Sequence, residues 1–312
     1  MSLKDKAMLV AFTTSHWTAK KFDRKVTDEV DEAHNASKSG RFNKTLLISP
    51  LLDDISSAVG KARTYHYGIT LPWDDAGLRL LPVAKYFDYT KKMEEFQVEH
   101  KQLVKVFLAE YPELREAAEI RLNTLFNKAD YPDAIQLENK FAIGYSFTPI
   151  ADSSDLRVEL TKDEINIIKQ NIESGVQNKI AIAKQSVVER ADKAVASMLE
   201  KLTDKHSTFR DSLVGNVVTV MELIPSMNFD DDEDLAMLAI KLRKLNVNPA
   251  LLRKDETVRK KTAKKAKKIL KKIQAIKFVE DAPVVVAEPV KVKKDKKKKK
   301  DKKNKKAKRI KK

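Results

Sequence analysis

Apolar residues in the second half of the chain recur with a helical period over a long stretch. They return every three or four positions from Ile165 to Leu202, ten steps that cover 37 residues, and this predicts one continuous helix. Thr161 and Glu164 form a capping-box pattern at its start, in which the two side chains satisfy free backbone amides. The positions are Ile165, Ile168, Ile172, Val176, Ile180, Ala183, Val187, Ala191, Ala194, Met198 and Leu202.

The period of this pattern indicates how the helix packs. A mean spacing of about 3.7 residues is close to an eleven-residue repeat, so a coiled-coil-like spine would be nearly straight or slightly right-handed. A spine of this length has to pack against another helix, in the same chain or in a second copy. Residues 162–206 are therefore a candidate surface for homo-oligomerisation.

Shorter helical patterns lie on both sides of the spine. The expected helices are 28–62 with interruptions near Gly40 and Pro50, 83–110 ended by Tyr111-Pro112, 113–128, 209–223 stopped by Pro225, 230–244 and 254–276. Segment 230–244 starts with acidic residues and ends with basic ones, which suits the helix dipole. Segment 254–276 has apolar residues spaced among lysines, so we interpret it as a basic amphipathic helix.

Two segments depart from the helical pattern. Alternating apolar residues from Phe141 to Phe147, followed by a short run at Leu156–Leu160, predict a small β-hairpin at about 141–160. Residues 63–82 contain two glycines, two prolines and a Trp-Asp-Asp sequence, and we interpret them as a structured loop.

These patterns predict a mainly α protein: an elongated helical bundle with a long coiled-coil-like spine, one small β-hairpin and a disordered basic C-terminal tail. Seven glycines in 312 residues is well below the ~7% of average composition, in agreement with long helices. The expected division is a helical body at 1–160, which holds the 63–82 loop and the hairpin, a long helix and helical hairpin at 161–252, a basic amphipathic helix at 253–277, and a linker with a polylysine tail at 278–312.

Charge is distributed unevenly along the chain. Residues 291–312 hold sixteen basic and two acidic residues, which supplies +14 of the formal net charge of +17. Residues 253–277 hold twelve basic and two acidic residues, whereas residues 1–252 have a net charge of −4. Such a cationic end attracts polyanions and releases their condensed counterions, a gain that depends on charge and not on base sequence.

We therefore expect DNA or RNA to bind this end by electrostatics. No aromatic residue interleaves the lysines of the tail, so base stacking and sequence selectivity are not expected. Three other interpretations stay open: a tail that only raises solubility, a nuclear address, and a tail held by the acidic body until a nucleic acid releases it. The candidate binding residues are Lys260, Lys261, Lys264, Lys265, Lys268, Lys271, Lys272, Lys296, Lys297, Lys298, Lys299 and Lys300.

The 63–82 segment is the candidate recognition loop because it concentrates aromatic and cationic groups. Those groups either form a binding site or pin the segment onto the core, and we favour the packing interpretation because buried aromatic rings dominate packing. The candidate residues are Arg63, Tyr65, His66, Tyr67, Trp73 and Arg79.

The motifs of common enzyme chemistry are missing from the sequence. The chain has no cysteine, it has no Gly-x-x-x-x-Gly-Lys-Ser/Thr or Gly-x-Ser-x-Gly element, and its five histidines never take the His-Glu-x-x-His spacing. The acidic run Asp230–Asp234 lacks the calcium-loop pattern and is better interpreted as a helix start. We therefore predict no catalytic residue, no metal site, no cofactor and, since no apolar run reaches ~18 residues, no membrane span.

Three blocks of sequence carry a resemblance to a known family. They are Thr14-Ser-His-Trp-Thr-Ala-Lys-Lys, residues 62–82 from Ala-Arg-Thr-Tyr-His-Tyr-Gly to Leu-Arg-Leu-Leu-Pro, and Leu125-Phe-Asn-Lys-Ala-Asp-Tyr-Pro. Over residues of about 10 to 250 the chain resembles an uncharacterised helical family of tailed-phage and prophage proteins that is catalogued only as a domain of unknown function. The resemblance implies a helical body, a host bacterial cytoplasm as the setting, and a role as an accessory to a AAA+ ATPase. It implies no catalytic residue.

The sequence as a whole favours a non-enzymatic phage accessory protein that binds nucleic acid, or another polyanion, without sequence specificity through its basic C-terminus. The alternative is an interaction or adaptor protein for a AAA+ ATPase or another phage protein, with the spine and the 63–82 segment as its contact surface. A hydrolase is the remote alternative.

Overall fold

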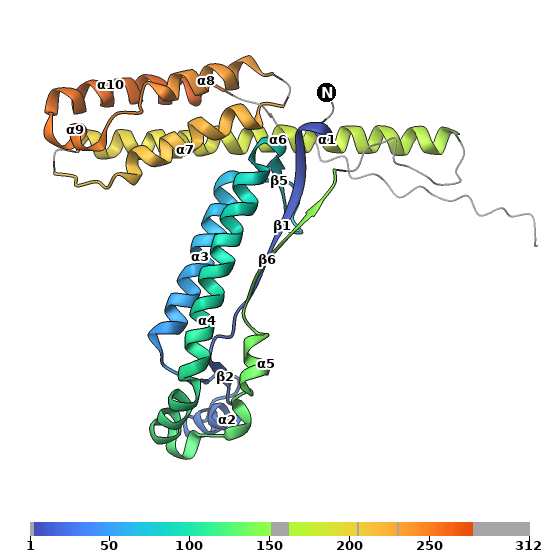
Figure 1. Ribbon diagram of the computed structural model, residues 1–312, viewed down its shortest axis with the longest axis vertical. Helices are drawn as coiled ribbons and strands as arrows, with labels where there is room; N and C mark the ends of the chain where they lie inside the picture. Colours follow the sequence, from blue (N-terminus) through green and yellow to red (C-terminus); the bar gives the residue numbers. More distant parts are fainter. Residues whose placement is uncertain (1–2, 151–161, 205, 230, 277–312) are drawn as a thin grey trace, which may run out of the picture. The chain divides into compact units, whose positions relative to one another are not determined.

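The chain is mainly α-helical, as the sequence predicts. The computed structural model in Figure 1 describes residues 3–150, 162–204, 206–229 and 231–276. The helices are α1 (Leu3–Lys6), α2 (Arg24–Ala33), α3 (Pro50–Ile69), α4 (Tyr86–Leu122), α5 (Ala134–Glu138), α6 (Lys162–Thr203), α7 (Ser212–Met227), α8 (Glu233–Arg243), α9 (Pro249–Lys254) and α10 (Glu256–Ile273). The strands are β1 (Ala7–Ser15), β2 (Lys20–Phe22), β3 (Asn43–Thr45), β4 (Leu71–Pro72), β5 (Leu78–Pro82) and β6 (Ala142–Thr148).

A small antiparallel sheet organises residues 3–150. Its strand order is β4-β5-β1-β6, and β1 pairs with β5 through Val10 and Arg79 and with β6 through Phe12 and Tyr145. Because side chains alternate along a strand, neighbouring residues of β1 point to opposite faces of the sheet. Both faces are buried at this point, so the sheet joins two cores.

The two faces of the sheet belong to different hydrophobic clusters. Val10 and Leu81 lie on the face covered by α3 and α4, in a cluster with Tyr89, whereas Leu9 and Leu80 lie in the cluster built by α6 and the helices after it. Figure 1 shows α3 and α4 side by side along β1. A strand with apolar residues at consecutive positions is expected where both faces are buried.

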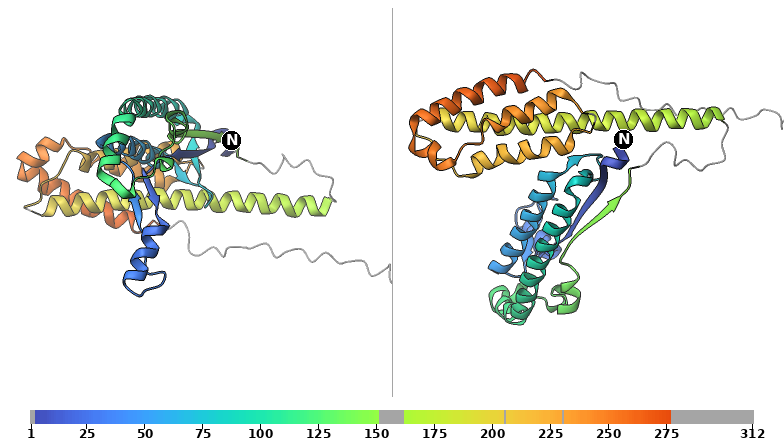
Figure 2. Two further views of the ribbon diagram at one scale, coloured as in Figure 1. Left: turned by 90° about the horizontal axis from the view of Figure 1, so that it is seen from below. Right: turned by 45° about the horizontal axis from the view of Figure 1, so that its top comes forward.

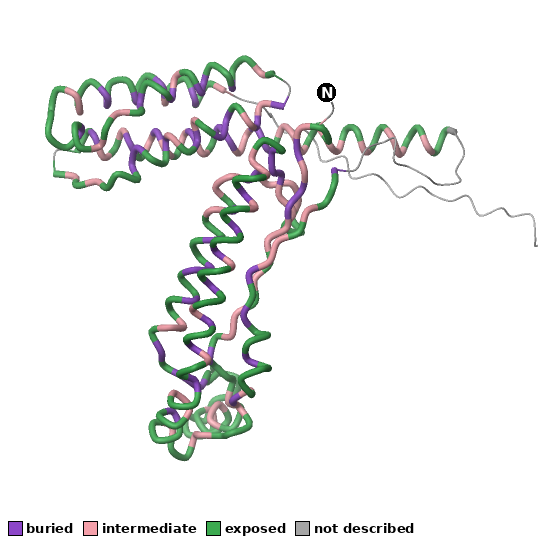
Figure 3. The backbone as a smooth tube through the Cα atoms, viewed as in Figure 1, coloured by how far each residue is buried: buried purple, intermediate pink, exposed green. Residues whose placement is uncertain are grey.

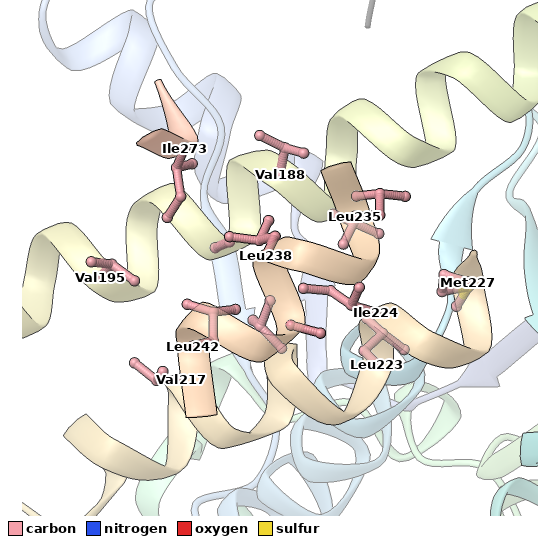
Figure 4. Close-up of a cluster of buried hydrophobic side chains, with 14 of the residues drawn as sticks. Val188, Val195, Val217, Leu223, Ile224, Met227, Leu235, Leu238, Leu242 and Ile273 are labelled. Atoms are coloured by element: carbon pink, nitrogen blue, oxygen red, sulfur yellow. The ribbon is translucent and has the colours of Figure 1, made fainter. Parts of the chain in front are cut away.

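Helices α6, α7, α8 and α10 form the second core. Aliphatic side chains from all four helices meet in it (Figure 4), and both views of Figure 2 show α10 and α7 running along the second half of α6. Val195 of α6, Val217 of α7 and Leu242 of α8 are fully buried. The long predicted helix is thus present, and its second half is part of a helical bundle.

The 63–82 segment is not a loop. Residues 63–69 continue α3 to Ile69, and β4 and β5 follow as an antiparallel hairpin around a turn that contains Gly77 at φ +96°. The loop prediction was wrong for two reasons. Gly68 lies in the last turn of α3, where a helix tolerates glycine at little cost. Strands β4 and β5 have two and five residues, which is too short to show an alternating pattern in the sequence.

The β-hairpin predicted at about 141–160 is present only in part among the described residues. Its first arm is confirmed as β6, and β6 pairs with β1. The second arm, Leu156–Leu160, lies outside the described residues, as do the linker and the polylysine tail predicted at 278–312.

Two helix ends predicted at prolines are wrong. Helix α4 continues through Pro112 to Leu122, and α7 continues through Pro225 to Met227. Tyr111 is buried and donates a hydrogen bond from its hydroxyl to the Pro132 carbonyl at 2.9 Å. Tertiary packing on both sides of Pro112 outweighs the one backbone hydrogen bond that proline removes.

Candidate nucleic-acid interface

Helix α10 begins at a capped aspartate. The Asp255 carboxylate accepts hydrogen bonds from the backbone amides of Thr257 and Val258, at 2.7 and 3.1 Å. Aspartate is among the best N-cap residues because it satisfies amides that have no partner within the helix. The cap separates α10 from α9, so Arg253 and Lys254, which we predicted as part of one basic helix at 253–277, belong to the preceding short helix.

One face of α10 fixes it against α6. Arg259 donates hydrogen bonds to the carbonyls of Leu202 and Lys201, at 3.1 and 2.9 Å, and so satisfies free carbonyls at the end of α6. Ala266 and Ile273 are buried in the same core as α6. Arg259 is therefore a structural cation, and the buried face sets which way the rest of α10 points.

The opposite face of α10 is a row of exposed lysines, here called the lysine face. All eight lysines of the helix are exposed, whereas none of its buried residues is charged. At 100° per residue these lysines fall within an arc of about 160° that runs the whole length of the helix, ~27 Å. The lysine face consists of Lys260, Lys261, Lys264, Lys265, Lys267, Lys268, Lys271 and Lys272.

Few of these cations are neutralised by side chains in the part of the chain that the structure describes. Among the described residues, only Lys260 of the lysine face forms an ion pair with a carboxylate, at 2.8 Å from Glu256, the one acidic residue of α10. This is an exposed pair one helical turn apart, the kind that contributes a few tenths of a kcal/mol, about 0.3–0.5. The lysine face is thus a dense surface charge with little internal compensation.

A shallow groove runs beside one end of the lysine face. Its lining consists of Leu202 and Thr203 from α6 and of Glu256, Arg259, Lys260, Ala263 and Lys264 from α10. Three of the lining residues are cationic and one, Glu256, is a carboxylate that pairs with Lys260 at 2.8 Å. The excess of positive charge suits binding of an anion.

The structure brings together the seven lysines predicted at residues 260–272 and adds Lys267. Position 267 lies three residues after Lys264 and four before Lys271, so a helical projection of the sequence places it in the same row. The other predicted lysines, Lys296–Lys300, lie outside the described residues.

The six candidates from the 63–82 segment do not form one open site. Arg63, Tyr65, His66 and Tyr67 lie on α3, Arg79 lies on β5, and Trp73 lies between β4 and β5. Each has a contact within the chain, and together they connect α3, α4, α6 and the sheet. The contacts are Arg63 to the Thr14 hydroxyl at 3.2 Å, Tyr65 to the Asp88 carbonyl at 3.1 Å, His66 to the Tyr89 hydroxyl at 2.9 Å, Arg79 over the Tyr67 ring at 4.4 Å and Lys179 over the Trp73 ring at 4.8 Å.

Two arginines clamp the end of α3. Arg79 donates from Nε to the Thr70 hydroxyl at 2.7 Å, and Arg190 of α6 donates to the carbonyls of Gly68 and Thr70 at 2.9 and 2.8 Å. Burial, and then the positive charge of Arg190, lower the pKa of Arg79 to about 10. Burial, and then Arg79, lower the pKa of His66 to about 4. Sequence reasoning missed Arg190 because its partners are 120 and 122 residues away.

These contacts support the packing interpretation of the 63–82 segment. Carbonyls at a helix C-terminus carry partial negative charge, so the two guanidinium groups are held by the dipole of α3 without a carboxylate. Of the six candidates, Tyr67 is half exposed and His66 is 1% exposed. The segment joins α6 to the sheet and to α3.

The described residues contain no group of three or more histidine, aspartate or glutamate side chains that could hold a metal ion. No helix among them combines the length and the apolar character that crossing a membrane requires.

Comparisons with known proteins returned no match for this chain among protein-family models, curated proteins or solved structures. The resemblance to the phage and prophage family therefore stays a prediction.

Proposed function

We propose that this protein binds DNA or RNA without sequence specificity through the lysine face of α10 together with the basic residues that follow it. The observation that carries the proposal is the lysine face itself: eight exposed lysines on one side of a helix that is fixed in place by its other side. A polyanion gains by displacing counterions wherever such charge is dense. The resemblance to phage proteins makes a bacterial cytoplasm the expected setting.

The geometry of a helix limits what this surface can recognise. Along ~27 Å of helix, a nucleic-acid strand presents about eight phosphates at 3.4 Å each. Lysine ammonium groups bind phosphates as point charges, and the lysine face has no aromatic ring for stacking and no arginine for bidentate contact with a base. We therefore expect binding to duplex and single strands alike, with little discrimination between sequences.

The test compares two variants that lose the same charge. In the face variant, four lysines of α10 become glutamine; in the control variant, four exposed lysines of residues 3–150 do. The face variant carries Lys264→Gln, Lys267→Gln, Lys268→Gln and Lys271→Gln, and the control carries Lys91→Gln, Lys101→Gln, Lys105→Gln and Lys140→Gln.

The readout is the affinity for a labelled oligonucleotide over a series of salt concentrations. Each phosphate contact with duplex DNA adds about 0.9 to the slope of log affinity against log salt, so the face variant, which loses four cations, should lose about 3.6 units of slope and the control almost none. Deletion of residues 291–312 measures the contribution of the tail separately. If the face variant and the deletion both bind as tightly as the control, nucleic-acid binding is not the role of the basic C-terminus.

A further inference from the structure

The lysine face of α10 consists of two rows. Successive residues of a helix are turned by about 100°, so residues four, seven and eleven positions apart return to nearly the same side. The lysines of each row fall within an arc of about 60°, and the two rows point about 100° apart. The first row consists of Lys260, Lys264, Lys267 and Lys271, and the second row consists of Lys261, Lys265, Lys268 and Lys272.

Both rows are open on the surface of the described chain. All their lysines are exposed, and the buried residues of α10, such as Ala266 and Ile273, lie on the side turned away from both rows. Figure 3 shows exposed and buried residues alternating along this helix. In the part of the chain that the structure describes, Lys260 of the first row pairs with Glu256, and no carboxylate pairs with a lysine of the second row.

The two rows have different surroundings. The groove beside α10 is lined by two lysines, Lys260 and Lys264, and both belong to the first row. The first row therefore borders the end of α6, whereas the second row lies on the other side of the lysine face. A nucleic-acid backbone that follows the groove lies along the first row only.

Each row matches the charge of one nucleic-acid strand. From its first to its last lysine a row covers eleven residue steps, which is ~17 Å of helix. Over this length a strand presents about five phosphates at 3.4 Å each, so the lysines of one row neutralise most of their charge. A strand along one row leaves the other row turned about 100° away. The other row can then hold a second strand, whose repulsion from the first is reduced because both are largely neutralised.

We propose that α10 holds two nucleic-acid strands at once, one along each row, and thereby speeds the pairing of complementary single strands. This proposal rests on the proposed function, since each row must first bind a strand. Two strands on one helix have a raised concentration around each other, and concentration by charge increases association rates by about 10- to 1000-fold. Contacts between lysines and phosphates carry no sequence information, so the held strands can slide into register.

The test compares three variants of the full chain that each lose four lysines of α10. Lysine and glutamine have similar helix propensities, so all three variants should keep the helix. Two row variants carry Lys→Gln at every position of the first row or of the second row. The matched control, the half-length variant, loses the same charge from both rows and carries Lys267→Gln, Lys268→Gln, Lys271→Gln and Lys272→Gln.

The readout is the rate at which two complementary, end-labelled oligonucleotides pair at low salt, followed by energy transfer between the labels. The unmodified chain should raise this rate by about tenfold or more. The half-length variant keeps a shortened form of both rows, so it should pair the strands several-fold faster than either row variant. All chains keep residues 291–312, so the tail contributes equally to each of them.

Affinity for one labelled single strand separates this proposal from the function on which it rests. Each row variant keeps one complete row and should bind a single strand at least as tightly as the half-length variant. If the unmodified chain binds strands without speeding their pairing, or if the half-length variant is as slow as the row variants, the lysine face acts as one undivided charge and the two-strand proposal is wrong. If no chain binds a single strand, the proposed function fails as well.

Discussion

Residues 3–150 and residues 162–276 are held together by different side chains. In the first region, rings stack and cross in two groups, one around His66 and Tyr89 and one around Trp17 and Phe107. In the second region, the core is almost entirely aliphatic. The first region also holds most of the buried polar or charged side chains of the described chain: Lys44, Ser49, His66, Thr70 and His100, against Lys184 and Thr262 in the second.

This difference indicates which region makes the stability of the protein depend on pH. Buried histidines and ion pairs respond to pH, whereas an aliphatic core does not titrate. The lysine face lies on the aliphatic region, where changes in pH disturb the scaffold least. Substitutions of the buried polar groups of the sheet region therefore leave the residues of the lysine face themselves unchanged.

A first test asks whether the two regions unfold together or independently. Leu9 and Leu80 of the sheet lie in the core of α6, so we expect one cooperative transition. Phe107→Ala should cost about 3–5 kcal/mol and Leu242→Ala about 2–5 kcal/mol, because both side chains are fully buried. Each should shift the same transition.

Two signals in urea unfolding distinguish the cases. Trp17 packs in the first region, whereas Trp73 packs against the core of α6. In a Trp73→Phe background fluorescence therefore reports on the first region, whereas far-ultraviolet circular dichroism reports on the helices of both regions. The midpoints by the two signals should coincide for the unmodified chain and for both variants. If Phe107→Ala shifts the fluorescence midpoint and leaves a separate, unshifted transition in circular dichroism, the regions are independent.

The sequence predicts the aliphatic region better than the sheet region. The aliphatic region follows helical periodicity, so the length of α6 and the lysines of α10 were both predictable. The sheet region depends on contacts between distant residues and on very short strands, so β1 was missed and the 63–82 segment was mistaken for a loop. Periodicity alone does not show which half of α6 is buried, since the apolar positions of residues 163–182 and those of the buried half have the same spacing.

A buried ion cluster tests the polar character of the first region. The Lys44 ammonium group lies 2.8 Å from Asp130 and 3.2 Å from Asp23, and it donates to the Leu125 carbonyl at 2.8 Å. Lys44→Met should cost about 3 kcal/mol, because it leaves the nearly buried carboxylate of Asp130 with Lys21 as its one remaining cation among the described residues. Lys21→Met is the control: Lys21 also binds Asp130, at 2.7 Å, but its side chain is 52% exposed, so its loss should cost at most about 1 kcal/mol. If Lys44→Met and Lys21→Met lower the free energy of unfolding in urea equally, the burial of Lys44 does not strengthen its contribution to stability.

Acid should destabilise the fold mainly through buried histidines of the first region. Burial lowers the pKa of His16, His66 and His100 below the ordinary 6.5, with Arg79 as a further cause for His66 and His16 for His100. Below pH 6.5 the unfolded chain binds protons that the folded chain does not, so stability falls as the pH falls towards about 4, the folded pKa of His66. Carboxylates with lowered pKa, such as Asp130 and Asp232, keep their contribution above their ordinary 3.8.

Between pH 7 and pH 5, the change in unfolding free energy therefore comes mainly from the histidines. His66 alone should remove about 2 kcal/mol of unfolding free energy over this range, since each unit of pH below the unfolded pKa costs ~1.4 kcal/mol per proton. His100→Leu should reduce the pH dependence, because His100 is buried and its Nε2 has no hydrogen-bond partner to lose. The control is His206→Leu, at an exposed position between α6 and α7, and the reduction should be larger for His100→Leu. A urea midpoint for the unmodified chain that is the same at pH 7 and pH 5 would mean that these histidines are protonated without cost in the folded state, and the sheet region would then be no more sensitive to acid than the aliphatic bundle.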